Sequence, residues 1–241
     1  MSGGRARVAA LISGRGSNMA ALIEAAADPA FPAEIALVLS NRPDAAGLLR
    51  ATEAGIPAVV VDHKMFGKDR QAFDEAVDAE IRARHIDLVC LAGFMRLLTP
   101  WFVARFEGRL INVHPALLPA FRGLDTHARA LAAGVRLHGA SVHFVVPEVD
   151  AGPIIVQGAV PVADDDTADS LAARVLTVEH RIYPLALRWL AEGRVSVVDG
   201  RCKIAGSTMG ATTMGATAPD ATAVGGTGGD SPGVLIAPSI G

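Results

Sequence analysis

The chain has 241 residues, of which 51% are hydrophobic and 20% are charged, and its formal net charge is −3. That length is enough for one sizeable core, so a single α/β domain is the economical expectation. The weak negative charge excludes a strongly basic surface of the kind that binds a phosphate backbone, so we expect no nucleic-acid partner. No apolar run approaches the roughly 20 residues of a membrane span, and the two cysteines lack metal or redox spacing. We therefore expect a cytoplasmic protein with no membrane partner.

Short apolar runs alternate with helical patterns along most of the chain. This alternation predicts parallel strands joined by right-handed crossover helices. Strands are expected at residues 7–13, 34–40, 58–61, 87–92, 109–114, 138–146 and 154–162. Helices are expected at residues 19–27, 45–54, 69–84, 125–133 and 166–192, with a further helix opening at residue 99.

The helix boundaries carry specific signals. Thr99 is a good N-cap and Pro100 suits the first helical position, and Asp125 can cap the helix that follows it. Pro184 should kink or divide the long helix at 166–192, because a proline inside a helix removes a backbone hydrogen bond. Residues 195–198 and 202–204 could form a hairpin over Asp199 and Gly200.

The composition changes near residue 205. Residues 205–241 are rich in Gly, Ala, Thr and Ser and contain no Lys, Arg or aromatic residue. Such a segment has little bulky apolar surface to offset the entropy of ordering it. We therefore predict one folded domain over residues 1–204, followed by a disordered tail.

One strand ends in an amide and an imidazole. Asn112 and His114 are two residues apart, so they project from the same face of the strand at 109–114, and Pro115 ends its hydrogen-bond ladder. The carboxyl ends of strands in an open α/β sheet are where ligands bind. A polar pair that merely caps a turn is the structural alternative.

A glycine loop lies between the first strand and the first helix, in the sequence Ser-Gly-Arg-Gly-Ser-Asn at residues 13–18. It does not fit a dinucleotide fingerprint, because Met19 stands where the third glycine would be, and the lysine of a Walker loop is missing. Gly16, Ser17 and Asn18 can still offer backbone N–H groups, a hydroxyl and an amide to an anion at the helix N-terminus. A tight turn with no ligand is the alternative.

Seven histidines raise the question of a metal site. His138 and His143 are five apart on one predicted strand, which sends them to opposite faces, so they cannot readily chelate one ion. We therefore predict no metal. One of the two could lie near the site while the other is structural.

Asp150 lies in a turn between two predicted strands. A solvated turn residue is the structural explanation. If Asp150 instead pairs with His114, its carboxylate favours the imidazolium form and creates a general acid. With Asn112 as a donor to a developing oxyanion, the three residues would support attack by an external amine on a carbonyl.

These segments resemble a known family. The chain is similar to the folate-dependent glycinamide ribonucleotide formyltransferases from residue 7 to about residue 200. The similarity rests on LISGRGSN, LAGFMRLLTP, LINVHPALLPAFRGLDTH, HGASVHFV, EVDAGPIIVQ and VEHRIYP, in this order. It implies a Rossmann-like open twisted sheet, parallel in its N-terminal half, with antiparallel strands added C-terminally and helices on both faces.

The resemblance also implies roles for individual residues. His114 would be the catalytic acid, Asp150 would tune it, and Asn112 would bind the formyl oxygen. The substrate phosphate would lie at Gly16, Ser17 and Asn18, and its ribose or glycinamide end at Glu179. The residues implied to contact the folate are Arg70, Met95, Arg96, Leu97, Leu98, Asn112 and Val146, and those implied to line the site are Pro115, Ser141 and His143.

The implied reaction transfers the formyl group of the cosubstrate 10-formyltetrahydrofolate to the amine of 5'-phosphoribosylglycinamide in purine biosynthesis, in an enzyme that could be a homodimer. Hydrolysis of the same folate is the main alternative, since it needs the same three residues with water in place of the amine. Such hydrolases carry an added N-terminal regulatory domain, and transferases acting on initiator tRNA carry an added C-terminal one. A non-catalytic phosphate sensor would need the glycine loop but not Asn112, His114 and Asp150 together.

Overall fold

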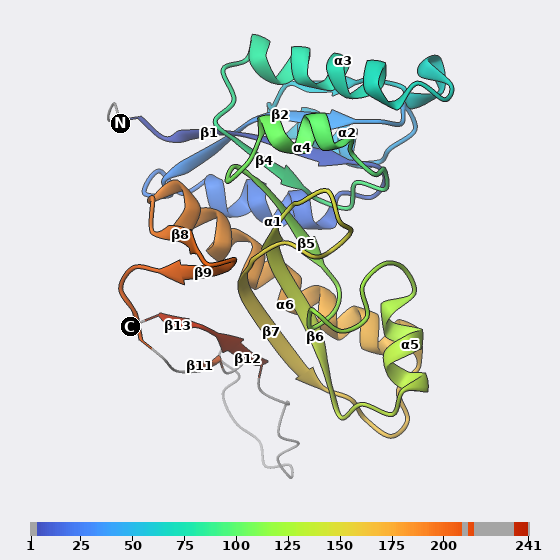
Figure 1. The fold of residues 1–241 in the computed structure, drawn as a ribbon, viewed down its shortest axis with the longest axis vertical. Coiled ribbons are helices and arrows are strands. Elements are labelled where there is room, and N and C mark those ends of the chain that lie inside the picture. Colours follow the sequence, from blue (N-terminus) through green and yellow to red (C-terminus); the bar gives the residue numbers. More distant parts are fainter. Residues whose placement is uncertain (1–3, 209–211, 215–233, 241) are drawn as a thin grey trace, which may run out of the picture.

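The computed structural model describes residues 4–208, 212–214 and 234–240. Within these residues, nine strands form one sheet in the order β11-β12-β7-β6-β5-β4-β1-β2-β3, in which β11 spans Thr212–Met214 (Figure 1). The N-terminal strands are β1 (Ala6–Ile12), β2 (Ala33–Ser40), β3 (Ala58–Val60), β4 (Leu88–Leu91) and β5 (Leu110–His114). These five pair in parallel, whereas β6 (Leu137–Phe144) and β7 (Ile154–Pro161) continue the sheet in antiparallel fashion. The predicted sheet is confirmed.

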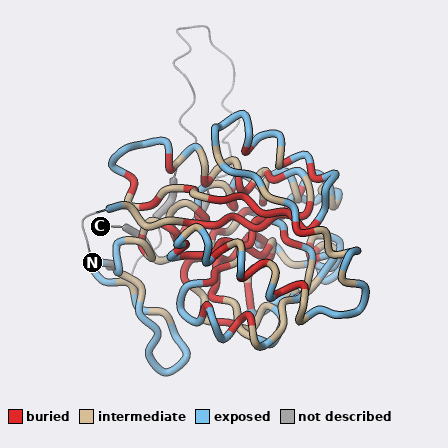
Figure 2. Tube along the Cα trace, turned by 90° about the horizontal axis from the view of Figure 1, so that it is seen from above, coloured by how far each residue is buried: buried red, intermediate tan, exposed pale blue. Residues whose placement is uncertain are grey.

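Helices cover both faces of the sheet. The helices are α1 (Ser17–Ala26), α2 (Gly47–Glu53), α3 (Arg70–Ala83), α4 (Pro100–Arg105), α5 (Thr126–Ala132) and α6 (Ala168–Ala191), with a 3-10 turn at His63–Phe66. Residues of α1, α2 and α6 pack into the core on one face, and residues of α3 and α4 pack into a second core on the other. The buried residues follow the strands through the middle of the molecule (Figure 2).

The order of the strands creates a switch point between β1 and β4. The chain runs from β1 outward through β2 and β3, and then returns to the other side of β1 to form β4 and β5. The loops after β1 and β4 therefore diverge at the carboxyl ends of neighbouring parallel strands. This is the position at which an open α/β sheet leaves a crevice for a ligand.

Helix α6 shows that Pro184, which was predicted to kink or divide it, does not divide it. The helix runs unbroken from Ala168 to Ala191, with Pro184 inside it. The flanking residues Tyr183 and Leu187 are fully buried, and their packing offsets the backbone hydrogen bond that Pro184 cannot make. Of the two predicted effects of Pro184, the division was wrong, and the kink stays a prediction.

The starts of α4 and α5 test two N-caps that were predicted from the sequence. Thr99 caps α4 as predicted, since its side chain accepts a hydrogen bond from the N–H of Phe102, and Pro100 opens the helix. Asp125 occupies the N-cap position of α5 but makes no side-chain cap there, and its backbone is left-handed with φ 55°. The predicted cap by Asp125 was wrong, because an N-cap side chain normally acts from an extended backbone and that of Asp125 is left-handed.

Only part of the predicted disordered tail, residues 205–241, can be compared with the structure. Residues 209–211, 215–233 and 241 lie outside the described residues. Strand β12 (Val234–Ala237), however, pairs antiparallel with β7, and Ile236 is 3% exposed. For these residues the prediction of disorder was wrong, because the β7 edge supplies hydrogen-bond partners that local composition does not reveal. The hairpin of β8 (Val195–Val198) and β9 (Arg201–Ile204) agrees with its prediction.

The only tyrosine of the chain ties α6 to the central strands. Tyr183 is fully buried, and its hydroxyl lies 3.0 Å from the carbonyl oxygen of Leu91 on β4 and 3.3 Å from that of Ile111 on β5. It therefore fixes the register of α6 against the strand that carries Asn112 and His114.

The Tyr183→Phe variant should be less stable by about 1–2 kcal/mol, because two buried carbonyls lose a hydrogen-bond donor while the ring packing is kept. Urea unfolding measures the change, and the dependence of the unfolding free energy on urea should keep its slope. An unchanged unfolding midpoint would show that this hydroxyl contributes nothing to stability.

Candidate active site

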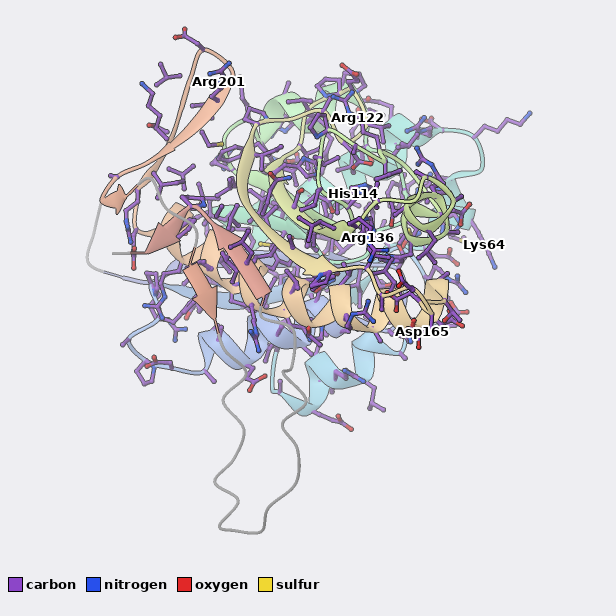
Figure 3. The ribbon with its side chains drawn as sticks, turned by 90° about the horizontal axis from the view of Figure 1, so that it is seen from below. Lys64, His114, Arg122, Arg136, Asp165 and Arg201 are labelled. Atoms are coloured by element: carbon purple, nitrogen blue, oxygen red, sulfur yellow. The ribbon has the colours of Figure 1, made fainter. Side chains whose placement is uncertain are left out.

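Asn112 and His114 lie on the same side of β5, as the strand period requires. Ile111 and Val113 alternate with them and pack into the core on the α6 side. His114 is 5% exposed, and Figure 3 shows it in the interior of the molecule, whereas Arg201 lies out on the β8–β9 hairpin. The strand end thus presents one amide and one imidazole from a rigid element.

The loop between β6 and β7 brings a carboxylate to this imidazole. Oδ2 of Asp150 lies 3.3 Å from Nδ1 of His114. Asp150 has a left-handed backbone with φ 50°, and the N–H of Gly123 donates to the same Oδ2 at 2.8 Å. The solvated-turn explanation of Asp150 is thereby excluded.

The second nitrogen of His114 also faces an acceptor. Nε2 lies 3.0 Å from the carbonyl oxygen of Phe121. The two ring nitrogens of His114 therefore each face an oxygen, one of a carboxylate and one of a carbonyl.

His143 orients the amide of Asn112. Nδ2 of Asn112 lies 3.3 Å from Nε2 of His143, and Nδ1 of His143 lies 2.8 Å from the carbonyl oxygen of Phe144. Burial lowers the pKa of His143 from its ordinary value of 6.5, although the Phe144 carbonyl and Asp150 oppose this shift. A neutral ring that donates from Nδ1 to Phe144 keeps Nε2 as an acceptor for the Asn112 amide.

His138 makes no described hydrogen bond to the catalytic groups, although it lies close enough to His114 for the two rings to interact electrostatically. It is 1% exposed, and its ring meets the edges of the Phe121 and His127 rings. Burial, followed by the nearby His127, lowers its pKa to about 4. The two histidines of β6 thus occupy different environments, as their spacing predicted. Among the described residues, no group of three or more His, Cys, Asp or Glu side chains could hold a metal ion.

Ser141 does not line the site as predicted. It is fully buried, its hydroxyl donates to the carbonyl of Ala116 at 2.7 Å, and it accepts from the N–H of Leu118 at 3.0 Å. Gln157 on β7 donates to the same hydroxyl and to the carbonyl of Leu118. Ser141 and Gln157 therefore hold the turn after His114. The sequence reasoning missed Gln157, although an amide inside an apolar strand is a signal of a buried hydrogen bond.

A cavity of 610 Å³ opens beside the glycine loop. Its lining includes Gly16, Ser17, Asn18, Met95, Arg96, Pro115 and Glu179. Gly16 is left-handed with φ 69°, and a side chain there would come within 3.1 Å of the α-carbon of Gly47. The N–H groups of Ser17, Asn18 and Met19 begin α1, where helical geometry leaves them without intrahelical partners. They can bind an anion.

The side chain of Asn18 has a partner other than the predicted anion. Its amide nitrogen donates to Oε2 of Glu179 at 2.5 Å, which joins the glycine loop to α6. Burial raises the pKa of Glu179 from 4.5 to about 7, against the opposing effect of the Asn18 hydrogen bond. A carboxyl group that changes charge near neutral pH therefore lines this cavity.

A second cavity of 360 Å³ lies on the other side of Asn112. Its lining includes Arg70, Arg96, Leu97, Leu98, Asn112, His143, Val146 and Asp150. Of the residues predicted to contact the folate, only Met95 is absent from this wall, because it faces the larger cavity and is 72% exposed. Arg96 lines both cavities, which therefore adjoin at this residue.

The pH dependence of stability should report on Glu179. The Glu179 carboxyl group loses its proton near pH 4.5 in the unfolded chain and only near pH 7 in the native state. The native state therefore binds the proton more tightly, and the free energy of unfolding of the wild type should fall by up to about 3 kcal/mol between these pH values relative to that of Glu179→Gln. Urea unfolding of both proteins at pH 4.5 and pH 7.5 measures the difference. A stability difference that does not depend on pH would contradict the raised pKa.

The described helices include none long and apolar enough to cross a membrane.

The sequence model of one protein family, described as "Formyl transferase", matches residues 6–187. The chain belongs to the formyl transferase family.

Similar proteins narrow this assignment within the formyl transferases. The chain is 44% identical over 202 residues to phosphoribosylglycinamide formyltransferase of Escherichia coli strain K12, covering 84% of this chain and 95% of the relative. A crystal structure of glycinamide ribonucleotide transformylase 1 from Symbiobacterium toebii superposes with a TM-score of 0.81 at 44% identity, covering 84% of this chain and 95% of that one. These matches confirm the predicted family, that of the phosphoribosylglycinamide formyltransferases.

Some relatives are much longer. The trifunctional purine biosynthetic protein adenosine-3 of Gallus gallus is 50% identical over 193 residues, which cover 80% of this chain but 19% of the relative. The chain thus spans about a fifth of the length of such trifunctional relatives. A formyltetrahydrofolate deformylase from Pseudomonas syringae is also similar, with a TM-score of 0.77 at 30% identity over 84% of this chain and 67% of that one.

Proposed function

We propose that the protein transfers the formyl group of 10-formyltetrahydrofolate to the amine of 5'-phosphoribosylglycinamide. The observation that carries this proposal is the contact of His114 with Asp150 beside two adjoining cavities, of which the smaller is lined by Asn112 and Asp150 and the larger by Pro115, the residue after His114. One cavity suits a phosphate and the other a flat ring system. Transfer between two substrates requires this kind of juxtaposition.

The larger cavity would hold the ribonucleotide. Its phosphate would accept hydrogen bonds from the N-terminal N–H groups of α1 at Gly16, Ser17 and Asn18, where the helix dipole favours negative charge. Glu179, which lines the same cavity, would bind the ribose or glycinamide end. Pro115 would flank the ligand near His114.

The smaller cavity would hold the folate. The N–H groups of Arg96, Leu97 and Leu98 make no hydrogen bond within the described part of the chain, and all three residues line this cavity. These N–H groups are therefore available to a ligand. A pteridine carries donors and acceptors on one edge, so it suits such a backbone segment. Arg70 and Val146 would flank the ring system, while Met95 would contact the folate only from the side of the larger cavity.

The reaction would proceed by direct attack. The glycinamide amine nitrogen forms a bond to the formyl carbon, and the carbonyl oxygen becomes an oxyanion that Asn112 and His114 stabilise as hydrogen-bond donors. The amine loses a proton, the folate N10 gains one, and the bond between the formyl carbon and N10 breaks. Every step uses protein groups and the two substrates, so we propose a reaction without a metal.

The deformylase similarity supports one alternative, hydrolysis of the formyl folate. Mixing the protein with 10-formyltetrahydrofolate, with and without 5'-phosphoribosylglycinamide, separates the two reactions. Release of deformylated folate should depend strictly on the ribonucleotide. Equal release in its absence would establish the hydrolase, and no release in either case would leave a non-catalytic binding protein. A homodimer and a cytoplasmic location stay predictions.

The Asp150→Asn variant should lower kcat by on the order of 10²-fold, because the carboxylate that holds and stabilises the protonated His114 is lost. Glu148→Gln is the matched control. Glu148 lies in the same loop and pairs with Arg122 at the surface, so its neutralisation should leave kcat within twofold. Steady-state transfer rates at saturating substrates measure both effects, and equal kcat values for Asp150→Asn and wild type would exclude the proposed pairing.

A further inference from the structure

Three side chains from outside the segment 95–99 hold its backbone in place. The Ser13 hydroxyl accepts from the N–H of Met95 at 2.8 Å, and the Arg70 guanidinium donates to the carbonyl of Leu97. Oδ2 of Asp74 accepts from the N–H of Thr99 at 2.6 Å. The N–H groups of residues 96–98 that remain free for a ligand thus lie between anchored positions.

Asp74 is the least expected of these anchors. It lies on α3 and is 1% exposed, although an isolated buried carboxylate is costly. Burial raises the pKa of Asp74, and the hydrogen bonds from Thr99 and the nearby Arg70 and Arg96 guanidiniums oppose this shift. Both guanidiniums line the smaller cavity. A buried carboxyl group thus accepts a backbone hydrogen bond next to the proposed folate wall.

The neighbouring Phe73 links α3 to the same wall. The Arg96 guanidinium stacks over the Phe73 ring at 4.6 Å from its centroid. Two consecutive residues of α3 therefore position the segment 95–99. Phe73 supports the Arg96 side chain, and Asp74 fixes the backbone at Thr99, where the segment enters α4.

We propose that Asp74 is a positioning residue for formyl-folate binding. By holding the N–H of Thr99, it sets the direction of the free N–H groups of residues 96–98. This inference rests on the proposed function, since it assigns the smaller cavity to the folate. Asp74 touches no reacting atom, so its removal should weaken folate binding and leave the chemical step largely intact.

Asp78 provides a matched control from the same helix. It lies one turn after Asp74, is 2% exposed, and pairs with Arg82 at 2.8 Å and Arg105 at 3.1 Å. It makes no described bond to residues 95–99. Loss of either side chain removes a buried carboxyl group from α3, but only the loss of Asp74 releases the N–H of Thr99.

The experiment compares Asp74→Ala, Asp74→Leu, Asp74→Asn and Asp78→Asn with the wild type. Leu fills the volume without an acceptor, in case the Ala variant does not fold, whereas Asn retains an oxygen that can accept from Thr99. Calorimetry with 10-formyl-5,8-dideazafolate, without ribonucleotide, gives the dissociation constant. Hydrogen exchange of the Thr99 amide reports the anchor independently of any ligand.

Asp74→Ala and Asp74→Leu should weaken folate binding at least tenfold and raise KM for the folate similarly. In both variants, kcat should stay within threefold, KM for the ribonucleotide should stay unchanged, and the Thr99 amide should exchange faster. Asp74→Asn should recover part of the affinity, and Asp78→Asn should match the wild type in affinity and Thr99 exchange. Wild-type affinity in folded Asp74→Leu, or equal weakening in Asp78→Asn, would overturn the inference. If the wild type itself does not bind the folate, the proposed function fails, and the inference about Asp74 fails with it.

Discussion

The contact between Nδ1 of His114 and Oδ2 of Asp150, 3.3 Å long, joins the two halves of the sheet at the site. His114 ends the last strand of the parallel half, and Asp150 lies in the loop between two antiparallel strands. The contact depends on the antiparallel pairing of β5 with β6, which sets His143 opposite Asn112 and returns the chain to the same crevice. The antiparallel strands therefore serve the site as well as the core.

Helix α6 gives the site its second support. It fills the core with Val178, Ile182 and Tyr183, and the same helix carries Glu179 into the larger cavity. Because the Tyr183 hydroxyl bonds carbonyls of both β4 and β5, the position of Glu179 relative to His114 is set by buried packing. On the opposite face, α3 holds the wall of the smaller cavity through Arg70 and Asp74. Each cavity is thus shaped by a helix on a different face of the sheet.

Local patterns predicted the elements well and the contacts between them less well. The strands, the Thr99 cap and the hairpin over Asp199 follow from short-range signals, and the structure contains them. The predictions that were wrong depend on distant partners: core packing keeps α6 continuous through Pro184, and the edge of β7 orders residues 234–237. Ser141 was predicted to line the site, but Ala116, Leu118 and Gln157 use its hydroxyl fully.

The sequence by itself determined that Asn112 and His114 share a face at a strand end, because side chains alternate along any strand. It also determined a helix start after Gly16, whose first N–H groups have no internal partners and are proposed to bind an anion. Only the tertiary structure decided that Asp150 reaches His114, that Asn18 binds Glu179, and that Asp74 holds Thr99. Those contacts join residues between 25 and 161 positions apart, and their geometry depends on how the whole sheet twists and its helices pack. Hydrogen bonds of about 3 Å require that arrangement, which no local pattern encodes.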